Sequence, residues 1–310
     1  MRKLRYVSAQ PATDYYVWQV EVLINNFIQM GINPNNIDIV CHKVNGVIPK
    51  NWSNLADNYA ARFFFYDDTR VTKNYISSIR PNILKQHFQN HSYLQHDAIF
   101  YHDCDIIFSK SPNWDEFLED DKWYGSDTRF YISHSYIKDK GHNILEKMCE
   151  IVDINPKLVE ENEMNCIGAQ YIMKNIDYKF WESVENDCEN LFKQITDLNN
   201  EIKKDNKNYH ELQIWCADMW ALLWNGWKKG FETCCHDYFK FTWATERDVD
   251  FHNNLIFHNA GIVDNKQGLF FKGDYHNTIP YKVDLKIKEG TASKLYWDYI
   301  QEVGNKSVII

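Results

Sequence analysis

Two aspartates separated by one residue, Asp103 and Asp105, have the clearest chemical potential in this sequence. They lie toward the C-terminal end of residues 98–108, an apolar run that predicts a buried strand. Carboxylate oxygens are hard ligands that suit Mg²⁺ or Mn²⁺, and such a cation can bind diphosphate oxygens and neutralise a departing anion. An Asp-x-Asp pair alone is common in solvated turns. Its position at the end of an apolar strand favours a metal site.

Strands and helices alternate ahead of this acidic pair. The pattern predicts strands at residues 4–9, 37–44 and 61–66, and helices at residues 15–30 and 76–90. Such alternation is typical of a largely parallel sheet, in which ligands bind outside the carboxyl ends of the strands. The acidic pair falls at this edge, so we predict an α/β fold with a mostly parallel sheet flanked by helices.

The alternation becomes less regular beyond residue 110. We expect strands at residues 123–132 and 166–174, a charged helix at 180–204 and an apolar helix at 215–227. Repeats, low-complexity tracts and Pro/Gly-rich linkers are absent from the sequence. We therefore expect one continuous domain with two functional halves, residues 1–110 and 111–310.

The composition limits the classes of function. Of the 310 residues, 44% are hydrophobic, which is enough for a substantial core, and the net charge of −9 disfavours a broad nucleic-acid footprint. The N-terminus shows no apolar signal core or membrane span, which predicts a cytoplasmic protein. The eight cysteines form no CxxC pair, so we expect reduced core thiols. Vicinal Cys234 and Cys235 without a second ligand pair do not predict a metal site.

The acidic segment resembles the DXD strand of GT-A-fold glycosyltransferases, in which apolar residues flank Asp-x-Asp. Three further segments support the resemblance: residues 166–173 (CIGAQYIM), residues 215–220 (WCADMW) and residues 257–261 (FHNAG). The resemblance extends from the first strand to about residue 281. It implies a Rossmann-type GT-A fold and a metal-dependent transfer of a hexosyl or pentosyl group from a nucleotide sugar, with a UDP-sugar as the expected donor.

The resemblance also implies roles for individual residues. His258 would be the third metal ligand beside Asp103 and Asp105, with Mn²⁺ or Mg²⁺ as the cation, and Lys272 would bind the diphosphate. The first half would bind the nucleotide sugar, and the second half would bind the acceptor and carry the C-terminal metal element. The remaining donor-binding candidates are Ser8, Ala9 and Gln10 at the end of the first strand, Arg80 and Lys85 on the helix before the acidic pair, and Gly168, Ala169 and Gln170 in the sugar pocket.

Two departures from the family pattern leave the subfamily open. The usual Pro-Trp after Lys272 is absent, and Gly168-Ala169-Gln170 replaces the Asn-x-Gly of many retaining members. Whether the transfer retains or inverts the sugar configuration is therefore open as well.

Asp218 is our first candidate for the chemical step. An inverting enzyme needs a general base for the acceptor hydroxyl, and a retaining enzyme needs a group that stabilises an oxocarbenium-like centre. The weaker candidates are Glu211, Asp237, Glu246 and Asp127. The stripe of Trp215, Trp220, Trp224 and Trp227 has helical spacing, and we expect it to pack in the core.

Two alternative functions remain. A haloacid-dehalogenase-like phosphatase also carries Asp-x-Asp after an apolar strand, but normally close to its N-terminus. A noncatalytic nucleotide-sugar or carbohydrate-binding module would have little reason to keep Asp103, Asp105 and His258 together. The acceptor hydroxyl is also open: a glycan, a protein side chain, a lipid-linked sugar or a modified nucleobase.

Overall fold

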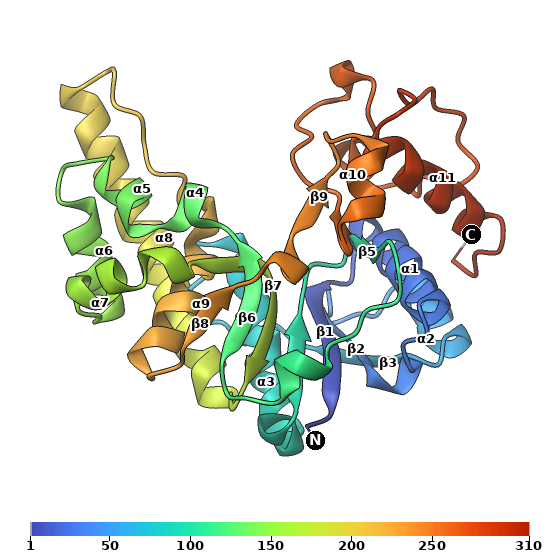
Figure 1. Ribbon diagram of the computed structural model, residues 1–310, viewed down its shortest axis with the longest axis horizontal. Helices are drawn as coiled ribbons and strands as arrows, with labels where there is room; N and C mark the ends of the chain where they lie inside the picture. Colours follow the sequence, from blue (N-terminus) through green and yellow to red (C-terminus); the bar gives the residue numbers. More distant parts are fainter. Residues whose placement is uncertain (1, 310) are drawn as a thin grey trace. The chain divides into compact units, whose positions relative to one another are not determined.

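The computed structural model describes residues 2–309 and has a mixed α/β architecture (Figure 1). Its larger sheet contains seven strands in the order β3-β2-β1-β4-β7-β6-β8, and a smaller sheet has the order β5-β10-β9. Parallel pairing joins β1 to β2, β2 to β3 and β6 to β8, whereas β6 and β7 pair antiparallel. The predicted α/β fold with a mostly parallel sheet is confirmed.

The residues gather into two compact units, each built from several chain segments. The α8 unit contains Asp68–Phe100 and Glu116–His236, and the β1 unit contains Leu4–Asp67, Tyr101–Asp115 and the chain from Asp237 onward. The division of function that we predict at residue 110 remains a prediction.

The parallel strands of the β1 unit are β1 (Leu4–Pro11), β2 (Ile37–His42) and β3 (Arg62–Tyr66). Two helices accompany them, α1 (Asp14–Gln29) and α2 (Lys50–Asn58). The buried Asp38 carboxylate accepts two hydrogen bonds from the Arg62 guanidinium, at 2.6 and 2.5 Å, and the two residues are register partners across β2 and β3. A charge-assisted pair of this geometry stabilises the strand register.

The smaller sheet lies in the β1 unit and positions the candidate site. Its central strand β10 (Ile256–His258) pairs antiparallel with β5 (Ile106–Phe108) and parallel with β9 (Phe241–Trp243). Helices α10 (Asp248–Asn253) and α11 (Ala292–Gly304) contact each other in this C-terminal region. All three residues of β5 and of β10 are buried, so this small sheet is a rigid support.

The α8 unit is mostly helical. Helices α3 (Ile79–Asn90) and α9 (Ala217–Lys228) pack against the long helix α8 (Tyr178–Asp205). Four short helices gather near one end of α8 (Figure 1): α4 (Arg129–Ile132), α5 (His134–Lys138), α6 (Ile144–Val152) and α7 (Pro156–Glu161). The strands of this region are β4 (Ala98–Tyr101), β6 (Trp123–Asp127), β7 (Ile167–Lys174) and β8 (Thr233–Cys235).

The prediction of one continuous strand over residues 98–108 is wrong in a way that matters for the site. The chain leaves the large sheet after Tyr101, turns through residues 102–105 and enters the smaller sheet at Ile106. In one continuous buried strand, Asp103 and Asp105 would point to the same buried face, where two unpaired charges are costly. The acidic pair therefore occupies a turn between two strands.

Two other boundaries differ from the prediction. The strand expected at residues 123–132 ends at Asp127, because Thr128 turns the chain and its hydroxyl donates to the Cys166 carbonyl, after which α4 begins. The first strand continues to Pro11 instead of ending at Ala9. The helices expected at residues 15–30, 180–204 and 215–227 are confirmed with small shifts.

The cysteines are all free thiols, and six of the eight are buried. This confirms the predicted reduced core thiols. Burial raises the pKa of Cys149 and Cys235 to about 12, so these thiols stay protonated at neutral pH. Within residues 2–309, none of the helices combines the length and the apolar character that crossing a membrane requires.

Candidate metal centre

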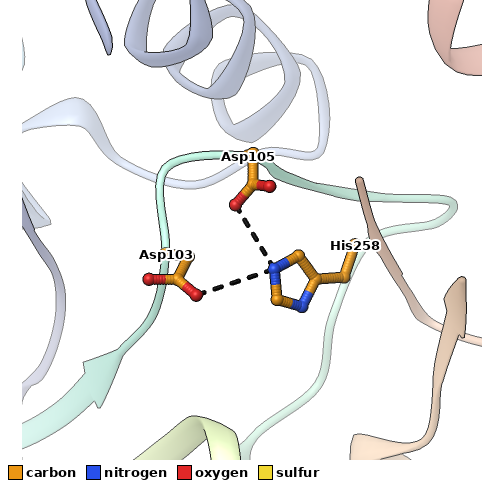
Figure 2. A group of neighbouring side chains, drawn as sticks. All are labelled: Asp103, Asp105 and His258. Atoms are coloured by element: carbon orange, nitrogen blue, oxygen red, sulfur yellow. Dashed lines mark ion pairs between the residues drawn. The ribbon is translucent and has the colours of Figure 1, made fainter. Parts of the chain in front are cut away.

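Asp103, Asp105 and His258 bring their ligand atoms within 4.8 Å of one another (Figure 2). The His258 Nε2 atom lies 3.3 Å from Asp105 Oδ1 and 3.6 Å from Asp103 Oδ2. Asp105 and His258 are buried, whereas the Asp103 side chain is 29% exposed. The structure therefore brings together the three residues predicted as metal ligands, and it leaves one of them accessible to a ligand.

Strand pairing explains why these residues meet. In the antiparallel register of β5 and β10, His258 lies opposite Ile106, and the Asn259 amide donates to the Asp105 carbonyl at 3.0 Å. The pairing therefore fixes the backbone of His258 beside that of Asp105. Gly261 follows with φ +87°, and an added Cβ there would lie 3.1 Å from the Trp243 ring. Gly261, three residues after His258, therefore allows the chain to turn away just beyond the histidine.

Lys272 contacts the carboxylate oxygen of Asp105 that does not face His258. Its ammonium group donates to Asp105 Oδ2, while Oδ1 faces His258. Burial alone would raise the pKa of Asp105, but the charge of Lys272 and the contact with His258 outweigh it and hold the pKa far below its usual range. Burial likewise favours neutral Lys272, but the Asp105 carboxylate outweighs it and raises the Lys272 pKa. Both groups therefore remain ionised.

Several residues that the sequence did not single out surround this cluster. His102 is buried, its Nδ1 lies 2.8 Å from the Asp103 carbonyl, and burial lowers its pKa to about 4, so the ring is neutral. Burial also raises the pKa of Tyr15 to about 12, and the Tyr15 ring stacks on His276 with centroids 4.5 Å apart. Tyr296 and Asn259 are buried, and the Tyr296 hydroxyl and Asn259 Nδ2 have no hydrogen-bond partner among the described residues.

The donor set fits a divalent cation such as Mn²⁺ or Mg²⁺. Two carboxylates and one imidazole provide hard oxygen ligands and a borderline nitrogen, a combination that Mn²⁺ accepts readily. With metal–ligand bonds of about 2.1 Å, ligand atoms lie about 3.0 Å apart in adjacent positions and about 4.2 Å apart in opposite ones. The two distances from His258 fall between these limits. The residues present therefore fit the cation that the sequence resemblance implies.

Asp218 belongs to a different cluster, inside the α8 unit. The Tyr75 hydroxyl lies 2.7 Å from Asp218 Oδ1 and 2.6 Å from the Trp215 carbonyl. One Arg80 nitrogen lies 3.9 Å from Asp218 Oδ2. Burial, together with the charge of Asp218, keeps the Tyr75 pKa far above its usual value, so the hydroxyl remains a donor. Asp218 is thus a half-buried carboxylate with an oriented neutral donor.

Glu189 on α8 fixes the segment that carries Tyr75. Its carboxylate is 3% exposed and accepts from the Asn74 amide at 2.7 Å, the Tyr75 amide at 3.3 Å and the Ser78 hydroxyl at 2.5 Å. A buried carboxylate with three donors is well satisfied and holds those donors in place. Glu189 therefore positions Tyr75, which in turn positions Asp218.

The small-residue segment on β7 lies close to the first turn of α9. A Cβ on Gly168 would lie 2.5 Å from the Met219 side chain and 2.7 Å from Thr128 Cγ2, so only glycine fits there. Ala169 has φ +60°, beside a shift in the β6–β7 register between Gly125 and Ser126. A left-handed alanine stores strain of the kind that clusters at functional sites. Gln170 is buried, and its Oε1 accepts from Ser126 Oγ at 2.7 Å.

The remaining donor-binding candidates have buried or paired side chains. Ser8, Ala9 and Gln10 are at most 5% exposed and lie within β1, which continues to Pro11, so they do not end the strand as expected. Ser8 Oγ and Gln10 Oε1 are buried without a hydrogen-bond partner among the described residues. Lys85 pairs with Glu185 at 2.7 Å. The donor-binding roles of all these residues remain predictions.

Three of the four weaker catalytic candidates have structural partners, and the role of the fourth, Asp237, remains a prediction. Asp127 pairs with Arg129 at 2.6 Å, Glu211 pairs with Lys203 at 2.6 Å, and Glu246 accepts from the Trp243 amide.

The tryptophan stripe is only partly buried in the core. Trp220, Trp224 and Trp227 are buried, but Trp215 is 60% exposed because it lies before α9 begins. The prediction that Trp215 packs in the core is wrong.

Comparison with solved structures gives distant likenesses. The chain is similar to the apo structure of the bifunctional glycosyltransferase WbbM, with TM-score 0.48, 11% identity and coverage of 99% of this chain. It spans half of that protein's length. It is also similar to the galactosyltransferase LgtC in complex with donor and acceptor sugar analogs, with TM-score 0.45, 11% identity and coverage of 96% of this chain and 95% of that chain.

A third similar structure is a glycosyltransferase involved in the glycosylation of the major capsid of PBCV-1, with TM-score 0.41, 10% identity and coverage of 84% of this chain and 94% of that chain. No protein-family model and no curated protein matches the chain. The solved structures are glycosyltransferases, the class that the sequence resembles. Because all three TM-scores are below 0.5, we infer the function from the residues of the site.

Proposed function

We propose that this protein is a metal-dependent glycosyltransferase that moves a sugar from a nucleotide-sugar donor to a hydroxyl acceptor. The observation that carries the proposal is the convergence of Asp103, Asp105 and His258, with Lys272 on the remaining oxygen of Asp105. A divalent cation and a lysine together provide the positive charge that binds a diphosphate. A UDP-sugar is the donor that the sequence resemblance favours.

The residues of the metal centre have distinct roles in this proposal. Asp103, Asp105 and His258 hold the cation, which when bound supplies positive charge to the leaving diphosphate. The partial exposure of Asp103 leaves this side of the cluster open to donor oxygens. Lys272 lies next to the cluster and stabilises the same leaving group as a point charge.

Asp218 is the proposed group for the transfer itself. The bond between the anomeric carbon and a phosphate oxygen breaks, and a bond from that carbon to the acceptor oxygen forms. The nucleoside diphosphate leaves with the electron pair, and the hydroxyl proton goes to a base. In an inverting reaction Asp218 accepts this proton, and in a retaining reaction it stabilises the cationic sugar. The Tyr75 hydroxyl orients its carboxylate for either role.

The proposal is tested by incubating the protein with UDP-glucose, UDP-galactose, UDP-N-acetylglucosamine and GDP-mannose, with Mn²⁺ or with EDTA. A glycosyltransferase releases nucleoside diphosphate slowly by hydrolysis when no acceptor is present. We expect this release with at least one donor, and only when Mn²⁺ or Mg²⁺ is present. A protein that hydrolyses p-nitrophenyl phosphate instead would be a phosphatase, and one that binds a donor without releasing nucleotide would be a noncatalytic module.

A further inference from the structure

A hollow of about 280 Å³ lies in the α8 unit, between α8 and the segment that leads into α9. Phe192 lines it from α8, and Glu211, Gln213 and Trp215 line it from residues 211–215. Pockets for drug-sized ligands measure about 300–1,000 Å³. This hollow is slightly smaller than that range, so it suits one or two sugar rings better than a complete nucleotide sugar.

The lining has the chemistry of a carbohydrate site. The Trp215 ring is 60% exposed, and a flat aromatic face desolvates the C–H face of a sugar at low cost. Asn200, Gln213 and Glu211 are exposed residues of the lining, and their amides and carboxylate can bond to neighbouring sugar hydroxyls. The lining itself contains no lysine or arginine, and Lys203 beside it is already paired with Glu211 at 2.6 Å, which disfavours a phosphate group as the occupant.

The wall of the hollow is held in place before any ligand binds. Asn199 Nδ2 donates to the Leu212 carbonyl at 3.2 Å, and Asn199 Oδ1 accepts from the Tyr209 hydroxyl at 2.9 Å. These bonds fasten the segment before α9 to α8. Gln213 Oε1 lies 3.3 Å from Trp215 Nε1 and restrains the exposed indole ring. A preorganised wall lowers the entropy cost of binding.

The hollow is linked directly to the proposed catalytic carboxylate. The Tyr75 ring stacks on Phe192, with centroids 4.8 Å apart and an interplanar angle of 24°. The Tyr75 hydroxyl lies within hydrogen-bond distance of both the Trp215 carbonyl and Asp218 Oδ1. Tyr75 therefore contacts a lining residue, the backbone of the exposed tryptophan and Asp218.

We propose that this hollow is the acceptor subsite and that the acceptor is a glycan, one sugar of which stacks on Trp215. This inference rests on the proposed function, because it assigns the acceptor of that reaction. It selects the glycan among the four acceptor classes that the sequence left open. The neutral, hydroxylated surface of a saccharide matches the amides and the aromatic face, whereas an anionic nucleic acid would meet a lining whose charged residue is the acid Glu211, paired with Lys203.

The test is saccharide binding measured by saturation-transfer NMR, without donor and without metal. The probes are maltose, lactose, cellobiose and N,N′-diacetylchitobiose. We expect at least one to bind, Trp215→Ala to weaken its binding about tenfold, and Trp215→Phe to retain most of it, because an aromatic contact contributes about that factor. Tyr93→Ala is the matched control, because Tyr93 is an exposed aromatic of the same unit outside the hollow lining, and this variant should bind normally.

A second measurement separates this inference from the proposed function. With an active donor and Mn²⁺, the bound saccharide should accelerate nucleotide release, and Trp215→Ala should raise its KM about tenfold. Donor hydrolysis without binding of any saccharide probe would overturn the acceptor subsite and leave the transferase proposal intact. Saccharide binding that Trp215→Ala does not weaken would also overturn it. Saccharide binding without any donor hydrolysis would show a saccharide site in the hollow but would overturn the transferase proposal, and with it the role of the hollow as an acceptor subsite.

Discussion

The metal centre and the Asp218 cluster hold their carboxylates in opposite ways. At the metal centre, the Lys272 ammonium group pairs with one oxygen of Asp105 and His258 lies beside the other, so the Lys272 charge keeps Asp105 ionised. At Asp218, the neutral Tyr75 hydroxyl lies 2.7 Å from Oδ1, and one Arg80 nitrogen lies 3.9 Å from Oδ2. The first environment suits a ligand that remains charged. The second gives the carboxylate a neutral donor that orients it, which suits a group that takes up a proton during turnover.

Removal of the metal ligands tests the first half of this comparison and should have the largest effect. Loss of an outer partner of a metal ligand already costs about 10–100-fold in affinity or activity. We therefore expect Asp103→Asn and Asp105→Asn to lower Mn²⁺ affinity about a hundredfold or more, measured by calorimetry, with nucleotide release lost in parallel. Asp197→Asn, an exposed acid of α8 paired with Lys193, serves as the control. Undiminished cation affinity in both variants would contradict the metal centre.

Substitutions of Asp218 and Tyr75 test the second cluster. Asp218→Asn should lower kcat about 10²–10⁴-fold, because it removes a group that acts on a proton or on developing charge. Tyr75→Phe keeps the ring on Phe192 and removes only the hydroxyl. We expect about a tenfold to hundredfold loss of kcat with an unchanged donor KM, because a hydrogen bond to a charged group contributes about 1.5–3 kcal/mol.

A pH profile separates a positioning role of Tyr75 from a purely structural one. The hydroxyl bonds to the Asp218 carboxylate and favours its ionised form. In Tyr75→Phe the acid limb of the kcat profile should move to higher pH. A loss of kcat with an unmoved profile, accompanied by an equal loss of stability, would assign Tyr75 to the fold alone.

Lys272→Met tests whether the lysine competes with the cation for Asp105. Lys272 occupies Asp105 Oδ2 in the structure, so its removal frees a ligand oxygen. We expect severalfold tighter Mn²⁺ binding without donor, and a higher KM for the nucleotide sugar because the diphosphate loses a cation. Lys266→Met changes an exposed lysine of the same region and should alter neither quantity. Equal Mn²⁺ affinity in Lys272→Met and the unmodified protein would show that the lysine does not compete for Asp105.

Asp187 allows a test of smaller effect, on the contact between α8 and α9, the helix that carries Asp218. This residue of α8 accepts a hydrogen bond from Asn225 of α9 at 2.7 Å, and burial raises its pKa to about 6. Because the folded pKa exceeds the usual value near 3.9, the folded state binds more protons between about pH 4 and pH 6. The contribution of Asp187 to stability therefore falls as pH rises through this window and stays low above it.

Asp187→Asn removes this titration while keeping an oxygen acceptor for Asn225. We expect it to raise the free energy of unfolding by about 1 kcal/mol at pH 8 and by little at pH 4.5, measured by urea denaturation. Lys193→Gln, an exposed change on the same helix, is the control. A gain of equal size at both pH values would show that the charge of Asp187 is not the cause.

The sequence indicated the group of Asp103, Asp105 and His258 better than the Asp218 cluster, for a physical reason. Asp103 and Asp105 are neighbours in the chain and follow an apolar run, and His258 follows another. Local pattern therefore indicated their chemistry, although it did not show that the acidic turn joins two sheets. That change of sheet depends on the pairing of β5 with β10, a long-range contact that hydrophobic periodicity does not report.

The partners of Asp218 had no local signal. Tyr75 lies in a short irregular segment, and Glu189 is one of several acids on a charged helix. Only the packing of distant elements shows that Glu189 holds the segment of Tyr75 in place. Helical spacing likewise grouped Trp215 with Trp220, although the helix begins at Ala217 and leaves Trp215 outside its buried face. Periodicity indicates which residues share a face, but it does not locate the end of the helix.

The β5–β10 pairing also has a consequence for how the protein matures. Asp105 lies in the first half of the chain, whereas His258 and Lys272 lie near its end, so a ribosome releases the acidic turn long before its partners exist. A nascent chain would thus hold two carboxylates without the histidine that completes the cation site. Under the proposed function, nucleotide-sugar chemistry would begin only after β10 pairs with β5.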